Sequence, residues 1–131
     1  MTEQAAREQK MKQTLQSYLD LFNRADAAAI AELYAQDATV EDPVGSPVKH
    51  GRPEIARFYG DSVKTKAQLK LAAPIRASHA NEAAMAFDVE LNMPTGRAVI
   101  HVIDTMRFND AGQIVAMRAF WGPSDMQIMK A

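Results

Sequence analysis

The apolar residues in the first quarter of the chain follow a helical period. In the stretch 3–24 they recur at intervals of four, three and four, at Met11, Leu15, Tyr18 and Phe22. This spacing places them on one face and predicts an amphipathic helix from about Glu3 to Arg24.

Local signals predict two further helices and a short strand between them. Asp26 is a suitable N-cap for a helix through AAAIAELYA, and Pro53 fits the first turn of a helix through GRPEIARFYGDSV. The residues expected on the buried sides of these two helices are Ile30, Leu33, Tyr34, Ile55, Phe58 and Tyr59. Between the helices, the stretch 39–42 predicts a strand that ends at Pro43.

From Ala67 onward the period becomes alternating, which is typical of strands. Apolar residues alternate in 69–71, 85–91, 98–108 and 114–121, and turn formers such as NDAG at 109–112 separate these runs. Four antiparallel strands are therefore predicted. Helices followed by a strand meander indicate an α+β fold in which a curved sheet wraps around the helices. Because no repeat or linker interrupts the pattern, we expect one domain over residues 1–131.

The strand predicted in RAVIHVIDTMRF carries a carboxylate on its more hydrophobic face. Asp104 shares that face with Ile100, Val102, Met106 and Phe108, and no basic residue lies on it. Removing a carboxylate from water costs several kcal/mol, so such a group is a neutral acid with a raised pKa or a tightly paired anion. A neutral acid would donate a hydrogen bond to a ligand, whereas a purely structural Asp104 would anchor the buried backbone.

Asp42 is the second acidic candidate, at the end of the strand in VEDPVGSP. Alternation puts Asp42 on the same face as Val40 and leaves Glu41 pointing outward, in solvent. A loop and water are expected near Asp42, which would keep it ionised. Two carboxyl groups whose surroundings separate their pKa values can serve as one acid and one base. Tyr18, on the apolar stripe of the first helix, would need a partner for its hydroxyl and completes the constellation.

Composition excludes several classes of function. The chain has 131 residues, 15 basic against 16 acidic side chains and no basic stripe, so nucleic acid is not an expected partner. It has no cysteine, which excludes disulfides and thiolate chemistry. No apolar run approaches a membrane span, and the polar first residues do not form a secretory signal. We expect a soluble, cytoplasmic protein.

The known metal and nucleotide motifs are also missing from the sequence. His50, His79 and His101 are far apart, and His101 is predicted on the face opposite Asp104, so no metal site is expected. The chain contains no Gly-rich phosphate loop and no serine nucleophile elbow. Hydrolase and nucleotide-dependent functions are therefore not favoured.

Four stretches resemble one family of enzymes. ATVEDPVG, HGRPEIARFY, IRASHANEAAMAF and VIDTMRFNDAGQIVAMRAFW are similar to the bacterial steroid Δ-isomerases, also called ketosteroid isomerases, within the nuclear transport factor 2-like superfamily. The similarity extends over nearly the whole chain. It implies a conical, strongly curved sheet around three N-terminal helices, a steroid substrate, and catalysis without metal or cofactor.

The resemblance also implies roles for individual residues. Asp42 would be the general base, while Tyr18 and protonated Asp104 would form the oxyanion hole. Tyr34 and Tyr59 would extend a hydrogen-bond network behind Tyr18, although as residues of helical stripes they could equally be ordinary core tyrosines. The reaction implied is the movement of the double bond of a 3-oxo-Δ5-steroid into conjugation through a dienolate.

The inward phase of the predicted strands suggests an apolar wall for such a ligand. The residues expected to line it are Met85, Phe87, Val89, Val102, Met106, Met117, Ala119 and Trp121. The opposite phase is also apolar, with Val99, Ile103, Ile114, Ala116 and Phe120. Such a face needs a cover, and the resemblance implies a homodimer packed sheet against sheet.

Two alternatives use the same pocket. A noncatalytic binding module would bind steroids or phenols without turnover, and a polyketide cyclase or dehydratase would also need an acid and a base there. The joint presence of Tyr18, EDP at 41–43 and VID at 102–104 favours the isomerase.

Overall fold

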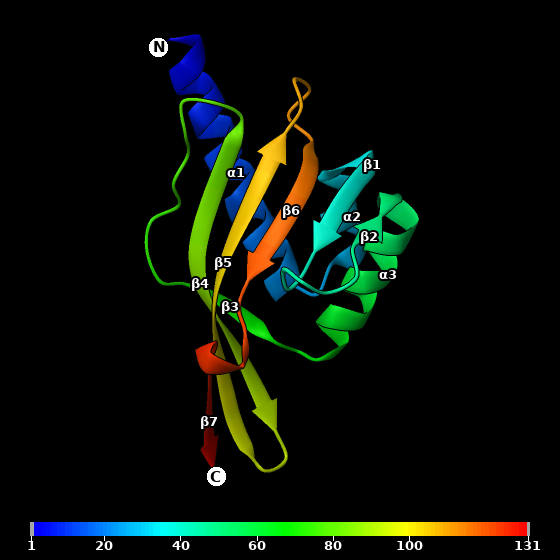
Figure 1. The fold of residues 1–131 in the computed structure, drawn as a ribbon, viewed down its shortest axis with the longest axis vertical. Coiled ribbons are helices and arrows are strands. Elements are labelled where there is room, and N and C mark those ends of the chain that lie inside the picture. The colour runs from blue at the N-terminus through cyan, green and yellow to red at the C-terminus, as the bar shows by residue number, and fades with distance from the viewer. Residues whose placement is uncertain (1, 131) are drawn as a thin grey trace.

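The structure is a computed structural model that describes residues 2–130. Three α-helices occupy the N-terminal half of this part of the chain: α1 (Glu3–Asn23), α2 (Ala27–Glu32) and α3 (Gly51–Lys64) (Figure 1). The strands are β1 (Tyr34–Glu41), β2 (Lys49–His50), β3 (Gln68–Leu71), β4 (Glu82–Met93), β5 (Gly96–Phe108), β6 (Ile114–Phe120) and β7 (Met126–Lys130). A short 3-10 turn, Pro123–Asp125, precedes β7.

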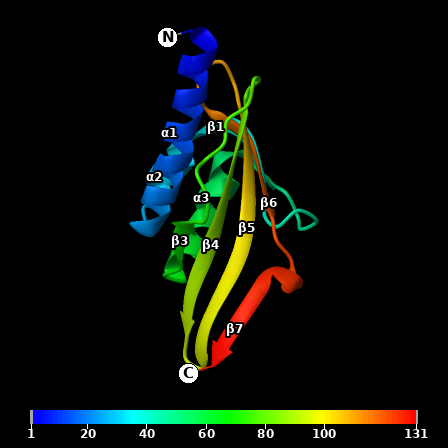
Figure 2. The same ribbon diagram turned by 90° about the vertical axis from the view of Figure 1, so that its left-hand side faces the viewer.

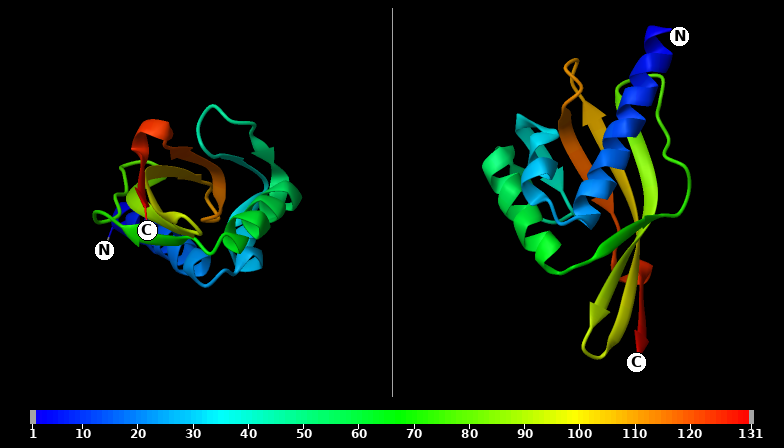
Figure 3. Two further views of the ribbon diagram at one scale, coloured as in Figure 1. Left: turned by 90° about the horizontal axis from the view of Figure 1, so that it is seen from below. Right: turned by 180° about the vertical axis from the view of Figure 1, so that it is seen from behind.

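The strands form one mixed sheet in the order β2-β1-β6-β5-β4-β3, with β7 paired to β5. The predicted meander of four antiparallel strands, β3 to β6, is confirmed, and β1 joins it in parallel with β6. The sheet is curved and does not close, and the helices lie on its concave side, as the side and end views show (Figures 2 and 3). The predicted α+β class and wrapped sheet are thereby confirmed.

The first helix forms where the apolar period predicts it. The Thr2 hydroxyl accepts a hydrogen bond from the backbone N–H of Ala5, and this N-cap begins α1. The predicted stripe, together with Leu19, is buried against the sheet. This packing fixes which side of the helix faces the concave interior, and Tyr18 lies on that side.

The second helix is shorter than predicted. Asp26 caps it as expected by accepting a hydrogen bond from Ala29, but α2 ends at Glu32. Tyr34 therefore begins β1 and is not a helical residue, although it is fully buried. Pairing with β6 competes with the helical continuation here, because the Ile114 N–H bonds to the carbonyl of Leu33 and Tyr34 is in register with Ile114.

The central strand β5 carries the inner face of the sheet. Its residues Ala98, Ile100, Val102, Asp104, Met106 and Phe108 are all buried, as the alternation predicts. β4 pairs with β5 along one edge, while β6 and β7 share the other edge. Strand β7 and the two-residue strand β2 were not predicted.

The sequence prediction placed Ile114 on the wrong face. The register between β5 and β6 shifts next to Phe108, which pairs with Ile114, whereas Arg107 pairs with Ala116. The extra residue, Val115, is a β-bulge that reverses the alternation, so Ile114 lies in the core. Val99 is also buried, and the apolar outer face is accordingly smaller than expected.

Asn23 joins the end of α1 to the edge strand β3. Its side-chain amide donates to the carbonyl of Leu69 at 2.8 Å and accepts from the Leu69 N–H at 2.7 Å, as a neighbouring strand would. Replacement by alanine would leave both backbone groups of Leu69 without this partner.

We therefore expect Asn23→Ala to lower the free energy of unfolding by about 1–3 kcal/mol, as the loss of part-buried hydrogen bonds does. Urea denaturation measures this change. Asn92→Ala is the matched control, since Asn92 is exposed on β4, and it should have a much smaller effect. Equal stability of the Asn23→Ala variant and the parent chain would contradict the bridging role.

Candidate functional site

A cavity of about 300 Å³ lies between the concave face of the sheet and the helices α1 and α3. Its lining is mostly apolar, with a small set of polar side chains. The lining residues are Tyr18, Phe22, Asp42, Phe58, Tyr59, Ser62, Thr65, Ala67, Leu69, Phe87, Val89, Leu91, Ile100, Val102, Asp104 and Trp121. A hollow of this size and polarity suits a small, largely hydrophobic ligand.

Three predicted residues from distant parts of the chain meet in this cavity. Tyr18 comes from α1, Asp42 directly follows β1, and Asp104 lies in the middle of β5. Each element was predicted from its own pattern. In the sheet β6 joins β1 to β5, and α1 packs over β3 and β4, so that the three side chains reach one space. The cavity thus contains a phenol and two carboxyl groups in an apolar wall.

Asp104 is fully buried and has no polar partner within residues 2–130. It is 1 % exposed, and neither carboxyl oxygen has a hydrogen bond in that part of the chain. Its partners in register, Met85 and Ala119, are apolar. Burial, followed by the nearby Asp42 carboxylate, raises the pKa of Asp104 well above its usual value. Both effects favour the neutral carboxylic acid over the carboxylate.

Asp42 is half-buried and has one strong partner. The indole N–H of Trp121 donates to its Oδ1 at 2.9 Å. Burial raises the pKa of Asp42, and the indole hydrogen bond opposes that rise by stabilising the anion. The sequence argument expected water and a loop to keep Asp42 charged. In the structure Asp42 is more buried than expected, and the indole N–H of Trp121 stabilises its anion in place of water.

The loop after Asp42 is held by the neighbouring acid. Glu41 Oε2 accepts from the N–H of Gly45, and Oε1 is bonded to the guanidinium of Arg118 at 3.1 Å. These two contacts lower the pKa of Glu41. The backbone N–H of Val44 also bonds to the carbonyl of Ala119. Glu41 was expected to be simply solvated, but it helps to fix the segment that carries Asp42.

The three tyrosines of the chain form a buried hydrogen-bonded row. The Tyr59 hydroxyl donates to the Tyr18 oxygen at 2.9 Å, and the hydroxyls of Tyr34 and Tyr59 are 2.6 Å apart. Since each phenol has one hydrogen, Tyr34 must donate to Tyr59 in this arrangement, and Tyr18 keeps its own hydrogen free. Burial raises the pKa of all three, so they remain protonated donors at neutral pH.

Comparison with known proteins identifies the family of this chain. The model of the SnoaL-like domain matches residues 15–117, a range that contains Tyr18, Asp42 and Asp104. The chain belongs to the SnoaL-like family. A steroid Δ-isomerase of Nocardioides simplex is 43% identical over 122 residues, covering 93% of this chain and 98% of that protein. The predicted resemblance to steroid isomerases is confirmed at the level of sequence.

A solved structure of the same shape has a different activity. It is the epoxide hydrolase/cyclase-like enzyme SalBIII, described in pyran ring formation in the polyether salinomycin. Its TM-score is 0.85 with 28% sequence identity, and the match covers 92% of this chain and 97% of that one. The predicted fold class is confirmed by this neighbour. The SnoaL-like scaffold therefore supports more than one reaction.

The predicted apolar wall is partly different in this SnoaL-like protein. Phe87, Val89, Val102 and Trp121 line the cavity as expected. The other four residues expected there are fully buried in the core and are not part of the lining: Met85, Met106, Met117 and Ala119. They share the inward phase, but they belong to the closely packed hydrophobic core. Tyr34 also lies behind the cavity and reaches it only through Tyr59.

Several lining residues were not predicted from the sequence. Phe22 and Phe58 had been placed on helical faces without a role in the cavity, and Leu91 and Ile100 were known only as strand residues. Thr65 and Ala67 lie in the connection between α3 and β3, where no period exists. For Phe22, Phe58, Leu91 and Ile100 the only signal was their position on the inward face. That position does not distinguish residues that line the cavity from residues of the core.

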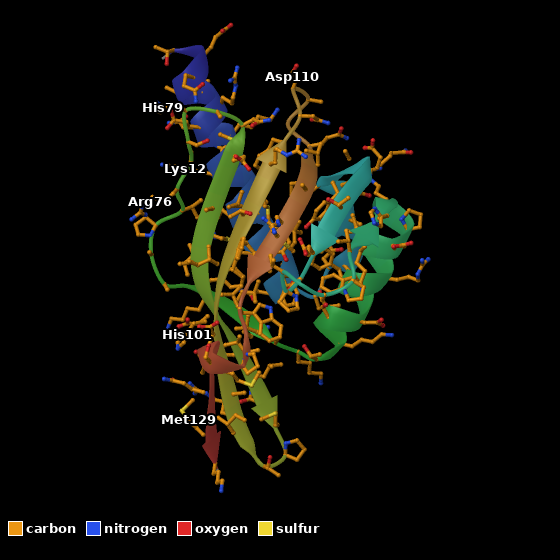
Figure 4. All side chains as sticks on the ribbon, viewed as in Figure 1. Lys12, Arg76, His79, His101, Asp110 and Met129 are labelled. Atoms are coloured by element: carbon orange, nitrogen blue, oxygen red, sulfur yellow. The ribbon has the colours of Figure 1, made fainter. Side chains whose placement is uncertain are left out.

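No metal-binding group of three or more His, Asp or Glu side chains occurs within the described range 2–130. Figure 4 shows His79 near the start of β4 and His101 much lower on β5, and His101 pairs with Asp88 at 2.6 Å. Over the same residues, no helix is long and apolar enough to cross a membrane.

The buried acid makes stability depend on pH. A carboxyl group whose pKa is raised by folding stabilises the fold fully below its ordinary value near 4, and this contribution is lost as pH rises toward the folded value. We expect Asp104→Asn to remove this loss, because the amide stays neutral.

The free energy of unfolding, measured with urea at pH 5 and pH 8, should therefore fall less with pH in Asp104→Asn than in the parent chain. Asp37→Asn, an exposed acid on β1, is the control and should keep the parental pH dependence. Parallel pH profiles for the parent chain and Asp104→Asn would show that Asp104 titrates normally in the folded state.

Proposed function

We propose that this protein is a steroid Δ-isomerase that converts 3-oxo-Δ5-steroids into the conjugated Δ4 isomers. The observation that carries the proposal is the pair of unequal carboxyl groups in one apolar cavity. Asp42 has a donor that stabilises its anion, whereas Asp104 has none and stays protonated. The 43% identity to a steroid Δ-isomerase supports the same reaction.

In the proposed reaction, the substrate ketone lies against Tyr18 and Asp104. The Asp42 carboxylate removes a proton from carbon 4, and the electrons of the broken C–H bond move into the ring and onto the ketone oxygen. The resulting dienolate carries negative charge on that oxygen. Asp42 then returns the same proton to carbon 6, the charge collapses, and the double bond lies between carbons 4 and 5.

Tyr18 and Asp104 stabilise the dienolate as preorganised donors. Both hydrogens are already directed away from other partners, so neither side chain must reorganise when charge appears. Tyr59 and Tyr34 act through Tyr18, because their hydrogen bonds strengthen its hydroxyl as a donor. Ketosteroid isomerases are themselves the standard example of a protonated aspartate and a tyrosine used in this way.

Every step is assigned to side chains of this chain, so the proposal includes no metal or organic cofactor. We assign it to the 131 residues as a single catalytic domain. Carbon 4 is a weak acid, and stabilisation of the dienolate intermediate by Tyr18 and Asp104 brings its acidity closer to that of Asp42, which makes the proton transfer feasible.

Likeness to SalBIII supports a second candidate function, a cyclase-type reaction that also uses an acid and a base in this cavity. The two functions differ in what they do to a 3-oxo-Δ5-steroid. The isomerase turns it over, whereas a cyclase or a noncatalytic binding module leaves the double bond in place.

Replacement of the proposed base tests the mechanism directly. Asp42→Asn should lower the isomerisation rate by about 10²- to 10⁴-fold, because an amide cannot accept the proton. Tyr18→Phe should lower it by about 10²-fold or more through loss of one donor to the dienolate. The assay follows the absorbance of the conjugated enone formed from a Δ5-3-ketosteroid, and Asp37→Asn serves as a control of unchanged rate. Undiminished turnover by Asp42→Asn would remove Asp42 from the mechanism.

We also propose that the protein is a homodimer joined through the convex face of the sheet. Ile103 and Phe120 are neighbours in register on that face and are 50% and 41% exposed. Large apolar side chains side by side on a sheet are typical of an interface.

Ile103→Arg should therefore convert a dimer to a monomer in sedimentation velocity at micromolar concentration, with circular dichroism unchanged. Val48→Arg is the matched control, because Val48 is 37% exposed but lies in the loop before β2. A parent chain that sediments as a monomer would contradict the proposed dimer.

A further inference from the structure

The polar side chains of the cavity fall into two groups. Tyr18, Tyr59, Asp42, Asp104 and Trp121 are connected by hydrogen bonds or by their electrostatic influence on one another, and together they form the reacting end. The second group consists of two hydroxyl residues in the same lining, Ser62 and Thr65. The proposed reaction does not use them.

The strand register places Leu69, which follows these hydroxyls in the chain, at the end of the cavity away from Asp104. From Asp104, the lining continues along β5 through Val102 to Ile100, and β4 accompanies it through Phe87 and Val89. At about 3.3 Å per strand residue, Ile100 lies roughly 13 Å from Asp104 along the sheet. Leu69 on β3 pairs with Val89, so β3 borders this far end.

Ser62 is on the last turn of α3, beside this far end. Tyr59, one turn earlier, is the residue that reaches Tyr18. Beyond Ser62 the helix ends and the chain passes through Thr65 and Ala67 into β3. A view from below shows the end of α3 running into β3 at this side of the molecule (Figure 3). Ser62 is half-buried, and Thr65 is exposed at the rim.

Both hydroxyl hydrogens are already used within the chain. Ser62 donates to the carbonyl of Phe58 at 2.8 Å, and Thr65 donates to the carbonyl of Ser62 at 2.7 Å. Thr65 also accepts from the N–H of Ala67. Ser62 keeps two free lone pairs beside the cavity. Among the described residues that line this end of the cavity, Ser62 therefore offers a hydrogen-bond acceptor, and neither of the two hydroxyls has a free hydrogen.

We propose that Ser62 is a specificity-determining residue that accepts a hydrogen bond from a hydroxyl group on the substrate ring farthest from the ketone. This inference rests on the proposed steroid isomerisation and adds a preference to it, for an alcohol over a ketone at the distal ring. A distal ketone is itself only an acceptor and finds no donor here.

The contact is remote from the atoms that react, so it contributes equally to the substrate and the transition state. Such uniform binding changes KM and leaves kcat unchanged. A hydrogen bond at a half-buried site corresponds to a preference of about 3- to 10-fold.

The test uses phenolic steroids that differ only at carbon 17, one with a hydroxyl and one with a ketone. Phenols mimic the dienolate but do not react, and the fluorescence of Trp121, the only tryptophan in the sequence and a lining residue, reports their binding. In the parent chain the alcohol should bind about 3- to 10-fold more tightly than the ketone. Ser62→Ala should remove the difference, and Ser62→Thr, which retains a hydroxyl, should preserve it.

Thr14→Ala is the matched control. The Thr14 hydroxyl donates to the carbonyl of Lys10 on α1, as Ser62 does to Phe58 on α3, but it lies outside the cavity. Its replacement should leave the preference intact. In the isomerase assay, the corresponding pair of Δ5-3-ketosteroids should differ in KM and share one kcat.

The outcomes separate this inference from the proposed function. Turnover of both substrates without a preference, or a preference that persists in Ser62→Ala, would overturn the role of Ser62 and leave the isomerase standing. Selective binding that depends on Ser62 without any turnover would support the distal site and contradict the isomerase. Failure of both phenols to bind would overturn both.

Discussion

The burial of one carboxyl group among aliphatic side chains is the constraint on which the candidate site depends. Asp104 sits in the centre of β5, between Met85 and Ala119, without a hydrogen-bond partner in residues 2–130. An unsatisfied polar group of this kind costs stability, of the order of 1–3 kcal/mol. The fold tolerates it because two dozen apolar residues pack around the same sheet. In the proposed reaction, this unsatisfied carboxyl group is the one that donates a hydrogen bond to the ligand.

The second carboxyl group, that of Asp42, has surroundings different from those of Asp104. Asp42 is in the same cavity, but it lies at the end of a strand, where the Trp121 indole can reach it and the Glu41 contacts fix its loop. The row of tyrosines adds a second donor, Tyr18, whose hydrogen is not used within the row. Position in the sheet thus gives the two carboxyl groups different surroundings, and the proposed roles of base and hydrogen-bond donor rest on that difference. SalBIII has the same fold and is described in pyran ring formation, so the fold alone does not determine the reaction.

Much of this arrangement was predictable because it follows from periods in the sequence. The stripe of α1, the inward phase of β5 and the position of Asp42 before Pro43 each follow from spacing alone. Alternation failed at Ile114, because a bulge inserts one residue without a signature in composition. It also failed to separate Met106 and Met117, which are core residues, from Val102, which borders the cavity. Periodicity identifies the inner face, but the space left between helix and sheet depends on how all the side chains pack.

The β4–β5 ribbon continues beyond the body of the molecule and is backed there by β7 (Figure 2). Residues of this ribbon, Val89, Leu91 and Ile100, form the outer part of the cavity wall, whereas the acidic groups are held by the inner part of the sheet. The outer segment of β4 and β5 therefore bounds the length of the cavity, whereas the inner part of the sheet holds the two acidic side chains. A shorter or longer hairpin would change the outer wall of the cavity, whereas Asp42 and Asp104 would keep their positions.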